Sequence, residues 1–169
     1  RSGEKELGFY FNAGELVALS EKSPDMAKGD LADVDGTQMS LISVEEMRAY
    51  MSQKPETVSD LATRIAVQLR QYNIKAYLDN TELFLNGGNK QKAKEQLKNA
   101  LKLAHLVRSQ LEAVKEIFEG NSMPADLKRE VDRLSQESSQ GAVEQIERQI
   151  EELGDTGLAE KLNDDMPGG

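Results

Sequence analysis

The residues that come closest to a chemical motif are acidic and lie near the N-terminus: Asp30, Asp33, Asp35 and Gly36. Closely spaced carboxylates followed by glycine suggest a calcium loop, which also needs acidic ligands at its first and twelfth positions. With Gly36 as the sixth position, those two places hold Leu31 and Ile42, so two ligand oxygens are missing. We interpret the segment as an acidic surface turn, with a weak divalent-cation site as the alternative.

The only histidine, His105, offers little for catalysis. No acidic residue lies three or four positions from it, whereas a carboxylate-bridged di-iron bundle needs Glu-x-x-His pairs. No Gly-x-Ser-x-Gly elbow accompanies it for a triad. The absence of cysteine excludes disulfides, thiolate catalysis and Cys-ligated metals. We therefore expect no catalytic residue, no metal site and no cofactor.

A run of lysines follows Gly87-Gly88-Asn89, a segment that lacks the spacing of a phosphate loop and is typical of a helix turn and cap. The basic stripe consists of Lys90, Lys94, Lys98 and Lys102. It has two interpretations: an intramolecular match with acidic residues of the last third, or docking of an acidic partner segment. The candidate acidic residues are Glu144, Glu147, Glu151 and Glu152.

Three aromatic residues could line a small pocket between helices: Tyr72, Tyr77 and Phe84. At their spacings, packing in the core is the default interpretation.

The overall composition narrows the classes of partner. The formal net charge of −9 disfavours nucleic acid and anionic membrane surfaces. No apolar run approaches the roughly 20 residues that span a bilayer, so we expect no membrane insertion. The first residues lack both Met and an apolar signal core, which predicts a processed or excised segment. Cytoplasm and periplasm both stay open.

The feature that must position everything else is an apolar seam, in which residues alternate at spacings of four and three as in a coiled coil. Its members are Ala93, Leu97, Ala100, Ala104, Val107, Leu111, Val114 and Phe118. Charged residues flank it, so a long helix with one narrow apolar face is predicted to about Glu119. That face must pack against something.

Further helices are predicted on both sides of the seam. Ser43 and Glu46 form a capping box for a short helix that Pro55 ends. A longer helix begins near Thr57 or Ser59 and stops at Gly87-Gly88, so it makes an antiparallel hairpin with the seam helix.

The C-terminal part carries two apolar stripes that are half a turn out of phase, so a kink or turn is expected near Gly141. The first stripe holds Leu127, Val131 and Leu134, and the second holds Val143, Ile146, Ile150 and Leu153. The acidic tail beyond Gly154 is expected to be mobile.

Residues 1–42 differ from the rest of the chain. Residues 7–11 read as a short strand, and residues 16–19 are either a returning strand or part of a short helix capped by Asn12. Residues 22–38 look like a loop, with one more short strand at 38–43.

Residues 77–101 resemble one tetratricopeptide-type helical hairpin in the spacing of six positions. They are Tyr77, Phe84, Gly88, Ala93, Leu97 and Ala100. The pattern does not recur at the family's period of roughly 34 residues, and no proline ends the unit. We interpret the resemblance as similar close packing of two helices and not as membership of the family.

The sequence thus predicts a mainly α protein: an antiparallel long-helix hairpin or bundle with a small N-terminal β or irregular element. We expect three segments: an N-terminal element (1–42), a helical core hairpin (43–120) and a C-terminal helical segment with a mobile acidic tail (121–169). The leading functional hypothesis is a non-enzymatic interaction module, either an adaptor, a chaperone-like binder or a self-assembling protein, that uses the seam. The alternative is a small-ligand or divalent-ion sensor.

Replacing Leu97 and Val107 with Asp places charges on the apolar seam, which we expect to unfold or dissociate the protein at a cost of several kcal/mol, roughly 3 or more. Replacing His105 with Ala should leave binding intact. Circular dichroism and native mass spectrometry measure the first effect. Loss of all activity in the histidine variant would contradict a non-enzymatic function.

Overall fold

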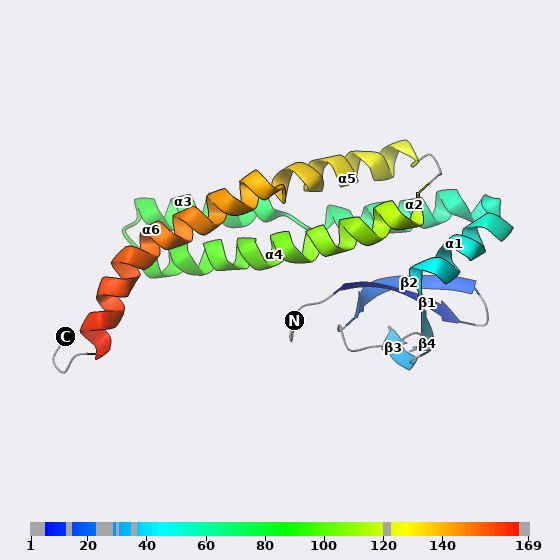
Figure 1. Ribbon diagram of the computed structural model, residues 1–169, viewed down its shortest axis with the longest axis horizontal. Helices are drawn as coiled ribbons and strands as arrows, with labels where there is room; N and C mark the ends of the chain where they lie inside the picture. Colours follow the sequence, from blue (N-terminus) through cyan, green and yellow to red (C-terminus); the bar gives the residue numbers. More distant parts are fainter. Residues whose placement is uncertain are drawn as a thin grey trace. The chain divides into compact units, whose positions relative to one another are not determined.

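The protein is mainly α-helical with a small N-terminal antiparallel sheet, as predicted, in a computed structural model (Figure 1). The structure describes residues 6–12, 15–22, 29, 31–34, 37–119 and 123–165, without side chains for part of the sheet and beyond Gly154. The chain divides into two compact units. Unit 1 contains residues 1–72 and 106–135, and unit 2 contains residues 73–105 and 136–169. Compactness thus divides the chain differently from the three consecutive segments expected.

Four strands form the sheet of unit 1, in the order β2-β1-β4-β3 with antiparallel neighbours. They are β1 (Glu6–Asn12), β2 (Glu15–Lys22), β3 (Leu31–Val34) and β4 (Thr37–Ile42). In the central strand β1, Phe9 and Tyr10 point to opposite faces, and both are at most 2% exposed. Because β2 pairs with β1, residues 16–19 belong to the returning strand of a hairpin and not to a short helix capped by Asn12.

Strand β3 was not predicted from sequence. The acidic residues in and around it favour a turn by propensity, but pairing with β4 satisfies the backbone of the segment, with Asp33 opposite Gln38. Asp30, Asp35 and Gly36 lie outside the described residues, so the calcium-loop alternative is not addressed by the structure.

Helix α1 (Val44–Gln53) begins at the predicted capping box. The Ser43 hydroxyl accepts a hydrogen bond from the Glu46 N–H at 3.1 Å, and the Glu46 carboxylate accepts one from the Ser43 N–H at 3.0 Å. Its inner face buries Met47 and Met51. A short 3-10 turn, η1 (Pro55–Thr57), then leads into the next helix.

The prediction of one continuous helix from residue 57 or 59 to 86 is wrong. Two helices occupy the segment, α2 (Val58–Arg70) and α3 (Ile74–Asn86). The side chain of Asn73 caps α3 by accepting a hydrogen bond from the Ala76 N–H at 3.0 Å. No glycine or proline marks the break, so the helical periodicity of the sequence conceals it.

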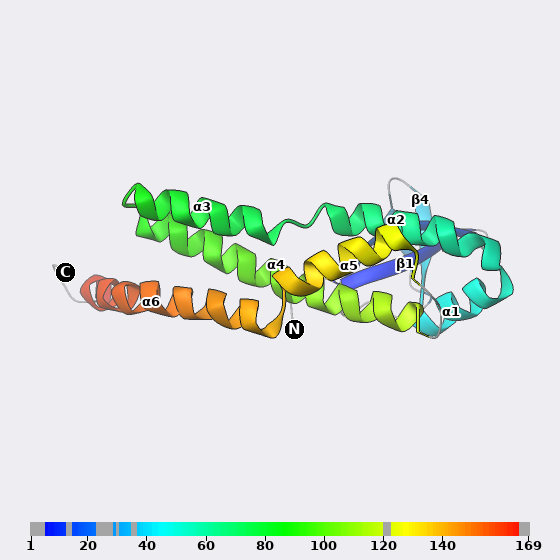
Figure 2. The same cartoon turned by 90° about the horizontal axis from the view of Figure 1, so that it is seen from above.

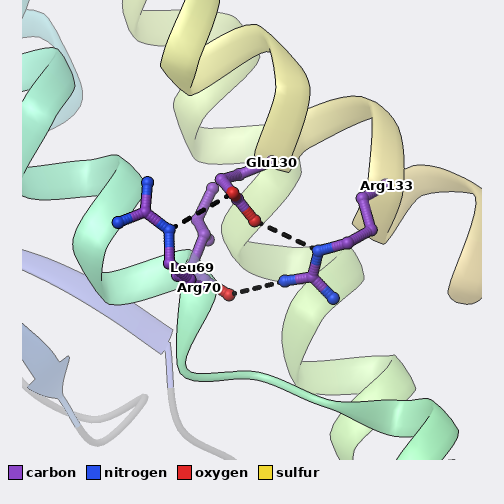
Figure 3. Close-up of polar contacts among 4 residues, drawn as sticks. All are labelled: Leu69, Arg70, Glu130 and Arg133. Atoms are coloured by element: carbon purple, nitrogen blue, oxygen red, sulfur yellow. Dashed lines mark hydrogen bonds and ion pairs between the residues drawn. The ribbon is translucent and has the colours of Figure 1, made fainter.

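A buried carboxylate stabilises the end of α2 within unit 1 (Figure 3). Glu130 is 6% exposed, and its two oxygens accept from Arg70 Nε at 3.4 Å and Arg133 Nε at 3.1 Å. Arg133 Nη2 also donates to the Leu69 carbonyl at 3.3 Å. Because the last carbonyls of a helix lack intrahelical partners and carry partial negative charge, an arginine at this position stabilises the end of α2.

The α3–α4 hairpin of unit 2 forms as the sequence predicts. Gly88 has φ +77°, the left-handed conformation that favours glycine at a helix end. The Asn89 side chain then accepts from the Lys92 N–H at 3.1 Å and caps α4 (Lys90–Ile117). The Gly87-Gly88-Asn89 segment therefore ends α3 and caps α4, as the sequence predicts.

The predicted break in the C-terminal part is confirmed at Ser138 and Ser139, just before Gly141. It separates α5 (Ala125–Glu137) from α6 (Gln140–Asp165), and the Ser139 hydroxyl accepts from the Ala142 N–H at 3.1 Å. The segment beyond Gly154 continues as helix to Asp165, since residues 158–162 are good helix formers.

Each unit has its own apolar core around one half of α4. Figures 1 and 2 show α3 and α6 alongside the N-terminal half of α4, and α2 and α5 alongside the C-terminal half. The buried apolar residues of α2 and α5 are Leu61, Ala62, Ile65, Ala66, Leu69, Leu127, Val131 and Leu134. Those of α3 and α6 include Ile74, Val143 and Ile146.

Replacing Glu130 with Gln should destabilise the protein by about 1–3 kcal/mol, because two arginines lose their shared buried anion. The matched control is Asp132→Asn on the same helix, which breaks an exposed pair with Lys128 and should cost at most about 1 kcal/mol. Urea denaturation measures both. Equal losses would contradict a special contribution of Glu130.

Burial of Tyr10 raises its pKa above the usual 10.0 by desolvation. In the unfolded chain this phenol ionises first, so its contribution to stability is fully present below about pH 10 and falls as the pH rises further. We expect wild type to lose stability relative to Tyr10→Phe between about pH 9 and about pH 11. Chemical denaturation of both proteins across that range tests this, and a difference independent of pH would contradict it.

Candidate functional site

The seam on α4 lies in the core of the chain and not on its surface. None of its side chains is more than 4% exposed. The residues are Ala93, Leu97, Ala100 and Ala104 in unit 2, and Val107, Leu111, Val114 and Phe118 in unit 1. Neighbouring helices of the same chain cover them, so the seam is not an exposed surface in this structure.

A groove in unit 2 offers such a surface. It lies between α3 and α6, has a cavity volume of about 420 Å³, and reaches Leu97 of α4 at its floor. Leu78 and Leu85 line its α3 side, and Leu153 lines its α6 side. Leu85 is 41% exposed although it is a large apolar residue. Leucines on both walls and the floor make this an apolar depression open to solvent.

Helical geometry explains why these side chains meet. Leu78, Thr81 and Leu85 recur at spacings of three and four, so they follow one face of α3. On α6, Gln149 and Leu153 are one turn apart and meet the same cavity. The Thr81 hydroxyl donates to the Tyr77 carbonyl at 2.8 Å, which occupies its proton within the helix.

The ionisable residues that line the groove are all acidic. They are Asp79 and Glu82 on α3 and Glu152 on α6, and all three are exposed. Among the described residues, none of them takes part in an ion pair. The groove therefore combines an apolar interior with three carboxylates at its rim, and no histidine or lysine lines it.

The basic stripe runs along α4, outside the residues that line the groove. Lys90, Lys98 and Lys102 are exposed, and Lys94 is half-buried. Within the described part of the chain, no ion pair joins these lysines to the four glutamates considered as their intramolecular match. Both interpretations of the stripe, the intramolecular match with acidic residues and the docking of an acidic partner segment, stay predictions. His105 is exposed and does not line the groove.

The aromatic residues considered as a pocket are divided between the two units. Tyr72 lies in unit 1 with its hydroxyl accepting from Gln68 Nε2 at 3.1 Å, whereas Tyr77 and Phe84 lie in unit 2. Phe84 carries Lys92 Nζ at 5.7 Å from its ring centroid. None of the three lines the groove.

Unit 1 contains a smaller cavity of about 270 Å³. Phe9 and Leu41 of the sheet form one side, and Ser109, Glu112 and Glu116 of α4 form the other. Its polar groups do not form a metal site: the described residues hold no group of three or more His, Asp or Glu side chains placed to bind a metal ion.

Sequence reasoning missed the groove because it followed the α4 seam. The signal was present in α3, where Leu78 and Leu85 extend the apolar face of the helix beyond the stripe that the core requires. When the apolar face of a helix is wider than one neighbouring helix can cover, a second neighbouring element is indicated. The α6 side of the groove could not be assigned without knowing which helix lies beside α3.

The described helices were also assessed for membrane spans, and the chain was compared with known proteins. Among the described helices, none has the length and apolar character needed to cross a membrane. Protein-family models, curated protein sequences and solved structures were compared with this chain, and none of them matches it.

Proposed function

We propose that this protein is a non-enzymatic interaction module that binds a helical segment of another protein in the groove between α3 and α6. The observation that carries the proposal is the open groove of about 420 Å³, which is lined by leucines from three helices and by exposed carboxylates on two of them. Apolar grooves between helices are a recurrent binding site for amphipathic helices, which insert side chains at helical spacings.

The dimensions of the groove favour a short helix. Leu78 and Leu85 are seven residues apart, which corresponds to two helical turns or about 10 Å at roughly 1.5 Å per residue. A partner helix with apolar residues at positions i, i+3 or i+4, and i+7 presents side chains over the same length. Function as an adaptor or chaperone-like binder follows from such a surface, with the packed seam serving as its support.

Leu85→Asp should weaken binding of an amphipathic helical peptide with leucines at i, i+4 and i+7 and uncharged glutamine flanks. The loss should be about tenfold or more, because an apolar contact is replaced by a charge. Leu83→Asp on the same helix is the matched control. It alters a leucine that is 68% exposed and does not line the groove, so affinity should change by less than about twofold.

Fluorescence anisotropy with the labelled peptide measures both affinities, and circular dichroism confirms that both variants fold. Equal losses for the two variants, or no binding to wild type, would contradict the proposed function. Concentration-dependent sedimentation that competes with the peptide would instead identify a second copy of the chain as the occupant.

A further inference from the structure

We infer that the segment bound in the α3–α6 groove is a basic amphipathic helix, with Lys or Arg on either side of its apolar face. This inference rests on the proposed function and adds the chemistry of the partner. It follows from the charges at the rim, whereas the proposed function follows from the leucines inside.

The rim carries acid on both walls. Asp79 and Glu82 lie on α3, and Glu152 lies on α6, so a helix between the walls would have carboxylates along both of its flanks. The remaining polar residues of the lining, Thr81 and Gln149, are uncharged. The groove thus presents three negative charges and no positive charge to its occupant.

These carboxylates lack a cationic partner within the described chain. Paired charges do occur on another helix of the fold, such as Lys128 with Asp132 on α5 at 3.4 Å. Lysines are also abundant in unit 2, but Lys92 lies over Phe84 and the basic stripe runs outside the groove lining. Asp79, Glu82 and Glu152 are therefore available to pair with cations supplied by the occupant.

Electrostatic complementarity of this kind selects partners more than it adds affinity. Acidic helices would meet repulsion on both walls, whereas basic ones would be attracted during the encounter as well as in the complex. An apolar floor with acidic rims also disfavours an anionic small molecule. The geometry points to a cationic, helical protein segment.

The test uses three synthetic helical peptides with the same leucine face and either Lys, Gln or Glu at the flanking positions. For the whole wild-type chain at low salt, we expect the Lys peptide to bind about three- to tenfold more tightly than the Gln peptide, and the Glu peptide to bind most weakly. The difference should shrink as salt is raised, since exposed charges are screened.

Glu82→Gln combined with Glu152→Gln should remove most of the preference for the Lys peptide without affecting the Gln peptide. The matched control, Glu95→Gln with Glu144→Gln, removes two exposed acidic residues of the same unit that do not line the groove, and should keep the preference. The two double variants have the same net charge, so their comparison separates the rim from the overall acidity of the chain.

The outcomes distinguish the two proposals. If all three peptides bind equally and Leu85→Asp still weakens them, the basic partner is excluded and the proposed function stands. If no peptide binds, both fail. If a Lys peptide with its leucines scrambled binds as tightly as the amphipathic one, the attraction is unspecific and the inference is overturned.

Discussion

The burial of the apolar face of α4 is the constraint on which the remaining architecture depends. A helix of 28 residues with a continuous apolar seam loses favourable free energy if that seam meets water, at about 0.8 kcal/mol for each exposed CH2 group. The chain satisfies this requirement twice, with different helices in each unit. In unit 1 the covering helices are α2 and α5, and in unit 2 they are α3 and α6. The small residues Ala93, Ala100 and Ala104 leave room for close helix packing in unit 2.

In the described part of the chain, the core of unit 1 contains two buried polar side chains, and they differ in whether they have hydrogen-bond partners. Glu130 is buried yet held by two arginines, one of which also reaches the end of α2. Gln110, in contrast, is fully buried, and neither of its amide atoms has a hydrogen-bond partner in the described structure. An unsatisfied buried amide costs about 1–3 kcal/mol, so the packing around α4 must offset that loss.

Local signals made much of the architecture predictable. The capping box at Ser43, the turn at Gly88 and the cap at Asn89 are interactions among neighbours in the sequence, and each forms as expected. The phase shift between the two C-terminal stripes correctly required a break, because one straight helix would have buried opposite faces.

The errors arose where distant residues decide the outcome. The end of α2 depends on Arg133, which lies 64 residues after Leu69, and no local pattern records that contact. Strand β3 depends on its pairing with β4. The candidate groove was missed for the same reason: α3 displayed surplus leucines, but only the tertiary structure shows that α6 supplies the facing wall.

The interleaved division into two units has a consequence for synthesis on the ribosome. Unit 1 combines residues 1–72 with residues 106–135, so its core is complete only after α5 has been synthesised. Unit 2 in turn joins α3 and the first half of α4 to a third helix, α6, which follows α5 in the sequence. Neither unit can therefore finish folding from one contiguous stretch of chain. After α4 has been synthesised, part of its apolar face stays uncovered until α5 and α6 follow, and exposed apolar surface promotes aggregation.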